Sequence, residues 1–354
     1  MFEIIRQCRS CQSPRLESIL DLGKTPLADA LLHEHQLGER EIHAPLEVVF
    51  CADCFLVQIT ATVSSEILFC NDYPYFSSVS KSLMRHFGAS AQHLIAYRKL
   101  NDNSLVMEAA SNDGYMLKNF TGKGIPVLGI DPAEGPAKAA QEAGIDTLCT
   151  FFTEGLAREL KAGGHAADVF LANNVLAHVP DLNGFVEGIK ILLKEDGVAV
   201  IEVPYLLDLI DHCEFDTIYH QHLCYFSATA LDGLFRRHGL YLNDVKRTSI
   251  HGGSLRLFLE KHEALKDSVR DLLKQERTRG SNCITFYGDF ASKVHDIRDS
   301  LQDLLIKIKQ KGARIAGYGA AAKATTLMSF CGIDRSAIDY VVDLNKHKHG
   351  RYMG

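Results

Sequence analysis

Four cysteines near the N-terminus form two pairs whose spacing is typical of metal ligands. Cys8 and Cys11 are three positions apart, and so are Cys51 and Cys54. Two thiolates at this spacing can bind one tetrahedral Zn²⁺, and a second pair completes an all-cysteine site with no open coordination position. Four separate buried or reactive cysteines are the alternative, but the doubled spacing disfavours it. The sequence therefore predicts a structural, non-catalytic zinc ion bound by these four residues.

A second group of reactive side chains lies between Phe215 and Ser227. Seven consecutive residues contain two tyrosines, two histidines and a glutamine: Tyr219, His220, Gln221, His222 and Tyr225. The ordinary pKa of histidine, about 6.5, suits a general base at neutral pH, and a tyrosine hydroxyl can donate to a developing enolate oxygen. The two histidines alone do not complete a second metal site, and a polar turn packed among aromatic residues is the structural alternative. The segment is therefore a candidate for proton abstraction next to a carbonyl group.

A third group follows an apolar segment over 104–108 and has the features of a nucleotide-cofactor loop. Gly114 and the three small residues before Asn112 let a ligand approach the backbone closely. Asp131 ends the next apolar segment, seventeen positions after Gly114, where a carboxylate can bind both ribose hydroxyls. This pattern alone does not separate NAD from S-adenosylmethionine, and an ordinary turn with an acidic neighbour is the simpler alternative. The lack of a full GxGxxG motif and the presence of Glu108 at the strand end favour S-adenosylmethionine.

Two asparagines stand at the end of a further apolar segment over 169–172. Asn173 and Asn174 are placed to contact the cofactor, because ligands of parallel sheets bind outside the carboxyl ends of the strands. His178 follows on the next loop toward the same crevice, although a lone loop histidine is more commonly a surface or packing residue. The predicted cofactor contacts are Glu108, Ala110, Asn112, Gly114, Asp131, Asn173 and Asn174.

Alternating apolar strands and amphipathic helices must position these side chains. The predicted elements are strands over 104–108, 127–130, 146–148, 169–172 and 197–203, with helices over 115–120, 136–143 and 185–193. Such alternation predicts a doubly wound, mainly parallel α/β sheet. After a helix over 231–238, strand-like segments over 241–248 and 254–259 can form an antiparallel hairpin at the sheet edge. A parallel sheet closed by such a hairpin is typical of a class I methyltransferase rather than a dehydrogenase.

Further segments flank this α/β region on both sides. The cysteine pairs occupy the chain to about Phe69, and a helix is predicted over 80–100. Charged helical sequence covers 263–311, and a small second βαβ element begins at Ala313. This element stops at Gly354 before it could fill out a sheet, so we expect further C-terminal sequence. The expected domains are a zinc-binding domain over 1–75, a methyltransferase domain over 76–262 and a C-terminal Rossmann-like domain over 263–354.

Composition limits the class of protein further. The 354 residues, 46% of them hydrophobic, suffice for two or three domains with cores of their own. The net charge of −6 and the lack of an arginine-rich stripe make nucleic acid an improbable partner. The ten cysteines have no disulfide-like spacing, no secretory signal opens the chain and no apolar run is long enough to cross a bilayer. We therefore expect a cytoplasmic protein with no membrane partner.

The order of these motifs resembles one known family. The chain is similar to the zinc-containing sugar C-methyltransferases of antibiotic deoxysugar pathways, such as those for mycarose, noviose and tetronitrose, which act on nucleotide-linked 4-keto sugars. The resemblance covers essentially the whole chain: both CxxC motifs, the segment 75–80, EAASNDG, AHVPD, EVPYL, IYHQHLCYFS, HGGSLR, and GYGAAAK with VVDLNKHKHGR. It implies an N-terminal zinc domain, a central S-adenosylmethionine domain and a C-terminal Rossmann-like domain, with the nucleotide sugar between the last two. Family precedent and the lack of coiled-coil heptads make a monomer plausible.

The resemblance also implies a mechanism. A ketone at carbon 4 acidifies the hydrogen on carbon 3, a base removes it, and the enolate carbon attacks the sulfonium methyl group. The family base is a histidine, here His222, with Tyr219 and His178 as neighbours that orient it or stabilise the enolate. Gln221 departs from the family, which has Glu at this place, and it cannot hold a negative charge against an imidazolium, so His222 is expected to be a weaker base. Ala110 replaces a usual glycine and costs backbone freedom without excluding the ligand.

Contacts with the nucleotide sugar are expected at three places. The first is the family segment 75–80. The second is the turn of the predicted hairpin, where glycines let backbone amides approach an anion and an arginine adds charge, although a simple turn is the alternative. The third is the GYGAAAK loop, because a helix N-terminus after a small-residue turn attracts a diphosphate. The expected substrate contacts are Tyr75, Ser77, His251, Gly252, Arg256, Tyr318 and Lys323.

The leading hypothesis is C-methylation at carbon 3 of a dTDP- or other nucleotide-linked 4-keto-deoxysugar. Methylation at another atom, or on a non-sugar ketone, would use the same cofactor site. Gln221 keeps open a zinc-bearing sugar-nucleotide-binding protein that has lost catalysis. An NAD-dependent sugar oxidoreductase is disfavoured by the missing glycine fingerprint.

Overall fold

The computed structural model describes residues 2–70 and 76–353, and the chain divides into two compact units. Unit 1 comprises Met1–Ser64, Tyr205–Ser227 and Glu276–Gly354, and unit 2 comprises Ser65–Pro204 and Ala228–Gln275. Tyr75, an expected substrate contact, lies outside the described residues. The units follow contacts in space, whereas the three expected domains follow the order of the motifs, so the domain limits stay a prediction.

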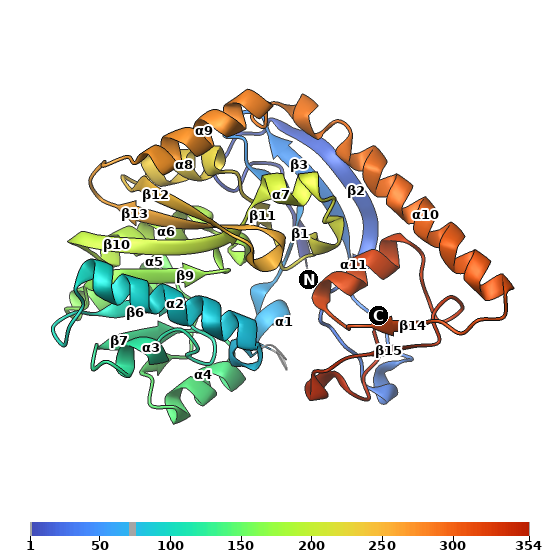
Figure 1. Ribbon diagram of the computed structural model, residues 1–354, viewed down its shortest axis with the longest axis horizontal. Coiled ribbons are helices and arrows are strands. Elements are labelled where there is room, and N and C mark those ends of the chain that lie inside the picture. Colours follow the sequence, from blue (N-terminus) through green and yellow to red (C-terminus); the bar gives the residue numbers. More distant parts are fainter. Residues whose placement is uncertain (1, 71–75, 354) are drawn as a thin grey trace. The chain divides into compact units, whose positions relative to one another are not determined.

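Unit 2 is built on one seven-stranded sheet in the order β12-β13-β10-β9-β6-β7-β8 (Figure 1). The parallel strands are β6 (Val106–Ala109), β7 (Val127–Ile130), β8 (Thr147–Leu148), β9 (Ala167–Asn173) and β10 (Leu193–Pro204). The strands β12 (Tyr241–Thr248) and β13 (Ser254–Glu260) form the antiparallel hairpin at one edge. The predicted class I methyltransferase fold is thereby confirmed.

Helices cover the sheet of unit 2 and close its core. They are α1 (Ser65–Phe69), α2 (Lys81–Arg98), α3 (Lys118–Thr121), α4 (Glu134–Glu142), α5 (Glu154–Ala162), α6 (Leu182–Leu192) and α8 (Ala228–Arg237), followed by α9 (Asp267–Arg279). The face of α2 that carries Leu83, Phe87 and Leu94 packs on apolar strand residues such as Val106 and Val200. The spacing of three and four positions explains this burial, because such residues share one side of a helix.

The loop after β6 delays the helix that was expected over 115–120. The helix α3 begins only at Lys118, because residues 115–117 form turns. Ala110, Asn112 and Gly114, before these turns, have positive φ, which a right-handed helix does not accommodate. The stretch before α3 is therefore a loop that exposes backbone groups at the carboxyl end of β6.

Unit 1 contains a four-stranded antiparallel sheet in the order β11-β4-β3-β2. Its strands are β2 (Leu16–Pro26), β3 (His43–Cys51), β4 (Val57–Ile59) and β11 (Cys224–Tyr225), and β1 (Phe2–Ile4) pairs separately with β5 (Ala61–Val63). The short helices η4 (Phe215–Thr217) and α7 (Leu206–Asp211) precede β11. The two residues of β11, shortly after His222, thus form an added edge strand of the cysteine-containing sheet.

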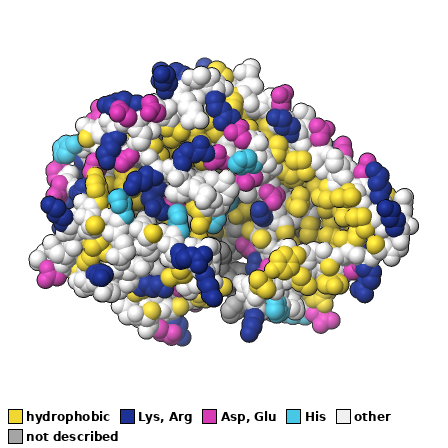
Figure 2. All heavy atoms as spheres, viewed as in Figure 1, with side chains coloured by type: hydrophobic (Ala, Val, Ile, Leu, Met, Phe, Trp, Pro, Cys, Tyr) yellow, Lys and Arg dark blue, Asp and Glu magenta, His cyan; other side chains and the backbone are white. Residues whose placement is uncertain are grey.

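The remainder of unit 1 is helical and ends in a two-stranded parallel sheet. The charged stretch over 263–311 is broken after α9, where Gly280 has a φ of +75° and ends that helix. The following elements are η6 (Ile284–Tyr287), α10 (Phe290–Gln310), β14 (Ala316–Tyr318), α11 (Ala322–Phe330) and β15 (Tyr340–Val342), with β14 parallel to β15. Hydrophobic side chains gather on the surface over α10 and these last elements (Figure 2), and exposed ones include Ile297, Leu304, Ile306, Tyr318, Tyr340 and Leu344. Among the described residues, no helix combines the length and apolar character needed to span a membrane.

Candidate active site and zinc centre

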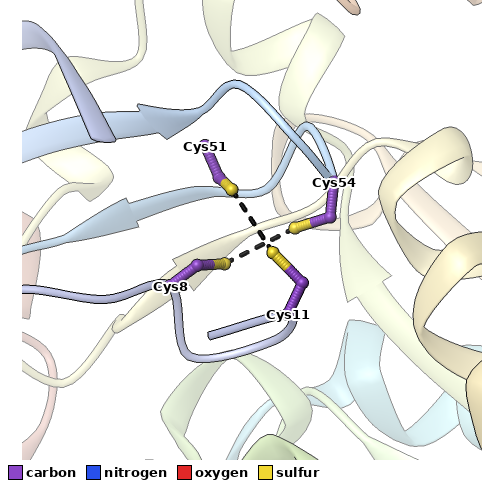
Figure 3. A group of neighbouring side chains, drawn as sticks. All are labelled: Cys8, Cys11, Cys51 and Cys54. Carbon is purple, nitrogen blue, oxygen red and sulfur yellow. Dashed lines mark hydrogen bonds between the residues drawn. The ribbon is translucent and has the colours of Figure 1, made fainter. Parts of the chain in front are cut away.

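The four predicted zinc ligands lie together in unit 1 (Figure 3). All four sulfur atoms are within 4.8 Å of one another; Cys8 Sγ is 3.4 Å from Cys54 Sγ, and Cys11 Sγ is 3.5 Å from Cys51 Sγ. Zinc–thiolate bonds of about 2.3 Å in a tetrahedron separate the sulfurs by roughly 3.8 Å, so the cluster fits one zinc ion. The fit confirms the predicted four-cysteine site.

The two cysteine turns have the same backbone geometry. The amide of Gln12 donates to the carbonyl of Cys8 at 3.0 Å, and the amide of Phe55 donates to the carbonyl of Cys51 at 2.9 Å. Gln12 and Phe55 both have positive φ. The backbone hydrogen bond of each turn therefore directs the two sulfur atoms of that turn toward one point.

The predicted cofactor loop is held in place by Asp131 at the end of β7. Its carboxylate accepts hydrogen bonds from the amide of Asn112 at 2.8 Å and from the amide of Ala133 at 2.9 Å. Burial raises the pKa of Asp131, and each carboxylate oxygen retains a lone pair for a further donor such as a ribose hydroxyl. Asp131 can therefore shape the loop and bind a ligand at once.

Gly114 fits this loop because a larger residue would not. It has a φ of +72°, and a Cβ atom there would lie 2.2 Å from Cδ1 of Ile145. Ala110 also has positive φ, at 54°, although it bears a side chain. The loop thus holds one strained alanine and one position where glycine is required.

Glu108 and Asn173 join the carboxyl ends of two neighbouring strands. Asn173 Nδ2 donates to Glu108 Oε1 at 3.0 Å, and both side chains are buried. Burial raises the pKa of Glu108 to about 8. Asn174 has a φ of 53°, and its amide donates to the carbonyl of Glu202 at 2.8 Å. These residues lie at or next to the carboxyl ends of neighbouring strands of unit 2, and their contact with S-adenosylmethionine stays a prediction.

Ser77 lies against the same loop. Its amide donates to Asn112 Oδ1 at 2.8 Å, and the amide of Ser78 donates to Asp113 Oδ2 at 3.2 Å. These contacts belong to η2 (Ser77–Val79). The expected substrate contact at Ser77 is therefore in direct contact with an expected cofactor contact.

His178 also belongs to unit 2 and ends η3 (Leu176–His178). Its half-buried ring meets the ring of Phe69 edge-on, with 5.7 Å between the ring centroids. Its assignment as a neighbour of the catalytic base stays a prediction.

His222 lies in unit 1, where its two ring nitrogens have different partners. Nδ1 is 2.8 Å from the carbonyl oxygen of Thr217, and Nε2 is 3.1 Å from the hydroxyl of Tyr219. A carbonyl can only accept, so Nδ1 carries the proton, and Nε2 is then the acceptor from Tyr219. The ring centroids of Tyr219 and His222 are 4.1 Å apart. The imidazole is thereby fixed in the tautomer that presents a basic lone pair at Nε2.

His220 has a different role from that of His222. Its ring is fully buried, and Nε2 lies 3.1 Å from the carbonyl oxygens of both Ala44 and Pro45, to which it donates. Burial lowers the pKa of His220. Among the described residues, the metal-binding group found is the cysteine cluster, and it includes neither histidine. Gln221, which lies between the two histidines in the sequence, is also buried.

Lys323 and Tyr318 share unit 1 with His222. Lys323 Nζ is 3.7 Å from Asp216 Oδ2, and Thr326 Oγ1, one turn along α11, donates to the carbonyl of Ile218 at 2.7 Å. Tyr318 is 76% exposed at the end of β14. The helix that carries the expected diphosphate contact is thus anchored to the segment that precedes Tyr219.

The expected substrate contacts of the hairpin turn lie in unit 2. His251 and Gly252 have φ values of 53° and 82°, as a tight turn requires. Arg256 donates through Nε to Glu202 Oε2 at 2.9 Å, and His86 Nε2 is 2.8 Å from Glu202 Oε1. The guanidinium charge is therefore already engaged by a fully buried carboxylate.

The sequence reasoning missed Glu202, His86 and the carbonyl of Thr217. Glu202 carried a usable signal, because a charge inside the apolar run 198–203 indicates a buried, paired carboxylate. No side-chain pattern predicts which backbone carbonyl a histidine will meet.

Comparison with known proteins decides the family. The chain is 32% identical over 359 residues to C-methyltransferase NovU of Streptomyces niveus, an alignment that covers 100% of this chain and 85% of that protein. The chain belongs to the C-methyltransferase family. Three family models match successive parts: a zinc-binding domain over 8–69, a methyltransferase domain over 84–245 and a C-methyltransferase C-terminal domain over 249–354. This C-methyltransferase uses S-adenosylmethionine and binds zinc through its cysteine cluster.

More distant proteins resemble only part of this C-methyltransferase. Ubiquinone biosynthesis O-methyltransferase of Azorhizobium caulinodans is 28% identical over 123 residues, 34% of this chain and 46% of that protein. The crystal structure of magnesium protoporphyrin IX methyltransferase from Synechocystis PCC 6803 with bound SAH has 15% identity and a TM-score of 0.39, and covers 51% of this chain and 83% of that one.

Proposed function

We propose that the chain methylates carbon 3 of a nucleotide-linked 4-keto-deoxysugar, with His222 as the base. The observation that carries this proposal is the pair of contacts that the two ring nitrogens of His222 make. Its Nδ1–H donates to Thr217, which leaves the Nε2 lone pair as the proton acceptor. A ketone one carbon away makes the C3 proton acidic enough for an imidazole to remove. The proton moves from carbon 3 to Nε2, and the electron pair moves onto the carbonyl oxygen as an enolate.

Tyr219 has a defined part in this step. Its hydroxyl donates to Nε2 at 3.1 Å, so it must turn to another acceptor before Nε2 can take a proton. The carbonyl oxygen of the substrate is such an acceptor, and a hydrogen bond to it strengthens as negative charge develops there. One rotation of the hydroxyl would therefore free the base and stabilise the enolate.

The imidazolium that forms has a partner that does not depend on Gln221. Its Nδ1–H continues to donate to the Thr217 carbonyl, whose partial negative charge favours the protonated ring. A carbonyl stabilises an imidazolium less than a carboxylate would, and the adjacent ketone lowers the basicity that the reaction requires.

Cofactor and acceptor residues are divided between the two units. When bound, S-adenosylmethionine would supply an electrophilic sulfonium methyl group for the enolate carbon, and its S–CH3 bond would break to leave S-adenosylhomocysteine. Glu108, Asn112, Gly114 and Asp131 of unit 2 are the residues proposed to hold it, with Ala110, Asn173 and Asn174 beside them. Lys323 and Tyr318 of unit 1 are proposed to bind the diphosphate of the acceptor, in the same unit as the base.

Mass spectrometry with a panel of dTDP- and other nucleotide-linked 4-keto-deoxysugars tests the proposal. One methyl group on carbon 3 is expected, and His222→Asn should abolish it while S-adenosylhomocysteine still binds. His212→Asn is the matched control, since this exposed histidine lies ten residues before His222 in the stretch Tyr205–Ser227 of unit 1. A methyl group on oxygen, or an unchanged rate in His222→Asn, would contradict the proposal.

Exchange of the C3 hydrogen with deuterium from solvent isolates the first step. With S-adenosylhomocysteine bound in place of the methyl donor, the wild-type protein should exchange this hydrogen and His222→Asn should not. Exchange without methylation of any panel sugar would indicate that the base is assigned correctly but the natural acceptor is another ketone.

A further inference from the structure

Arg9 stands between the zinc ligands Cys8 and Cys11, yet its side chain turns into the protein. It is 6% exposed. Its guanidinium donates to the carbonyl of Ile59 at 2.5 Å, to the carbonyl of Ala61 at 3.3 Å and to Thr62 Oγ1 at 2.6 Å. The backbone amide of Arg9 donates to Gln58 Oε1 at 3.0 Å. These hydrogen bonds connect the first cysteine turn to β4 and to Ala61 and Thr62 of β5.

The same strand holds the segment that contains His222. β11 pairs antiparallel with β4, so that Cys224 faces Gln58 and Tyr225 faces Val57. The amide of Ile59 donates to the carbonyl of Leu223 at 3.0 Å. Ile59 therefore accepts from Arg9 through its carbonyl and donates to the residue next to His222 through its amide.

A second attachment lies on the other side of His222. His220 donates to the carbonyls of Ala44 and Pro45 on β3, within the same cysteine-containing sheet. His222 is thus flanked by two anchors, at His220 and at Leu223, that both end on this sheet. The position of its Nε2 depends on where the sheet lies.

The charge of Arg9 has a reason to be buried there. Four thiolates around one Zn²⁺ leave a net charge of −2, and a neighbouring cation offsets it. The guanidinium also donates to four oxygen acceptors, the fourth being Gln58 Oε1 at 3.4 Å, as a buried charge requires. A methionine or leucine in this place would leave the carbonyls of Ile59 and Ala61 without these donors.

We infer that Arg9 is a positioning residue that connects the zinc centre to the catalytic histidine. The closed cysteine turn fixes Arg9, Arg9 fixes β4, and β4 fixes the edge strand that follows His222. The zinc module therefore orients the base in addition to stabilising the fold. This inference rests on the proposed function insofar as His222 is the base.

The test compares Arg9→Gln with Arg9→Lys and with Arg15→Gln in the full-length chain. Arg15 pairs with Asp53 and donates to Ala52 beside the second cysteine turn, but its side chain is largely exposed, unlike that of Arg9. Zinc content, binding of S-adenosylhomocysteine, the ¹⁵N-histidine NMR spectrum and turnover are measured on each. The Nδ1–H signal of His222 is assigned from its loss in His222→Asn.

Arg9→Gln should keep one zinc ion and the affinity for S-adenosylhomocysteine. Its His222 Nδ1 proton should exchange with water at least about tenfold faster, and kcat should fall by about tenfold with KM little changed, since a small misplacement of a catalytic group has such an effect. Arg9→Lys should be intermediate, because one ammonium can replace only part of the guanidinium fork. Arg15→Gln should match the wild type.

Two results would overturn the inference. One is an Arg9→Gln protein with wild-type proton exchange and kcat, and the other is loss of zinc in this variant, which would assign Arg9 to the metal site alone. If Arg9→Gln does not fold, Thr62→Val, which removes one acceptor of the guanidinium, tests the inference instead. The measured quantity is again the rate at which the His222 Nδ1 proton exchanges with water. Because that reading needs no substrate, it separates failure of this inference from failure of the proposed sugar methylation.

Discussion

Thr217 accepts a hydrogen bond from Nδ1 of His222 at 2.8 Å, five positions away in the same segment. The bond determines the chemistry of the ring, since it places the proton on Nδ1 and leaves Nε2 basic. In many enzymes a carboxylate makes this contact. Here a backbone carbonyl at the end of η4 does so, and its position depends on how the segment is held rather than on the identity of one side chain.

Tyr219→Phe should distinguish the contribution of the Tyr219 hydroxyl to catalysis from that of its aromatic ring. The ring packs at a tilt against His222 with 4.1 Å between centroids, so phenylalanine preserves the packing and removes only the donor to Nε2. If the hydroxyl stabilises the enolate, kcat should fall by about 10²-fold with a smaller change in KM. Steady-state kinetics with whichever sugar of the panel the wild-type protein methylates would measure this.

Tyr205→Phe provides the matched control for this experiment. Its hydroxyl donates to buried Glu276 at 2.9 Å in the same unit. The control should lower thermal stability but leave kcat within about twofold, since the hydroxyl acts structurally. A loss of kcat as large as that of Tyr219→Phe would mean that any buried hydroxyl of unit 1 produces the effect.

Local patterns in the sequence were enough to predict the zinc ligands and much of the sheet. The spacing within each CxxC pair is local, and the hairpin of β12 and β13 joins neighbouring segments. The pairing of β11 with β4 was not predictable, because it joins two-residue and three-residue strands more than 160 positions apart. The links from Arg9 to Ile59 and from His222 to Thr217 were not predictable either, because both end on backbone carbonyls, which have no sequence signature.

Gly114→Ala should weaken cofactor binding more than its backbone angle alone explains. The added Cβ would lie 2.2 Å from Ile145 Cδ1, so either Ile145 or the loop must shift. Gly124 has the same φ of +72° but nothing within 4 Å of its Cβ position, so Gly124→Ala contains the backbone strain without the clash. We expect Gly114→Ala to be less stable than Gly124→Ala by about 1–3 kcal/mol. Urea unfolding measures the difference.

Titration with S-adenosylhomocysteine completes the comparison of the two glycines. Affinity should fall about tenfold or more in Gly114→Ala and stay unchanged in Gly124→Ala, because only the first residue lies in the cofactor loop. Equal affinities in the two variants would exclude this loop as the cofactor site.

Glu108 should make the ligand-free protein less stable as the pH rises. Burial raises its pKa from 4.5 to about 8, so between these values the folded chain binds one proton that the unfolded chain has released. The free energy of unfolding therefore falls as the pH rises from about 4.5 to about 8, and this part of the stability is lost above the folded-state pKa. Glu108→Gln cannot ionise and should flatten this slope.

Urea unfolding at several pH values between 5 and 8.5 checks the effect of Glu108. The difference in stability between Glu108→Gln and the wild type should grow in favour of the variant as the pH rises. Glu159→Gln, at an exposed position on α5, serves as the control for removal of one charge. A difference that does not change with pH would mean that Glu108 is ionised throughout this range.

Removal of the zinc ion should affect the base before it affects the cofactor site. The four ligands and His222 belong to unit 1, whereas the residues proposed to bind S-adenosylmethionine belong to unit 2. Cys51→Ser should lose the metal and lower the midpoint temperature of the earliest thermal unfolding transition, which we assign to unit 1, by about 10 °C. A structural zinc ion contributes directly to folding. Below that temperature S-adenosylhomocysteine should still bind with nearly unchanged affinity, while deuterium exchange at carbon 3 is lost.

Cys149→Ser, at an exposed cysteine outside the cluster, should retain zinc, stability and exchange. Loss of cofactor affinity in parallel with zinc would show instead that the two units fold as one and that the metal supports both sites equally.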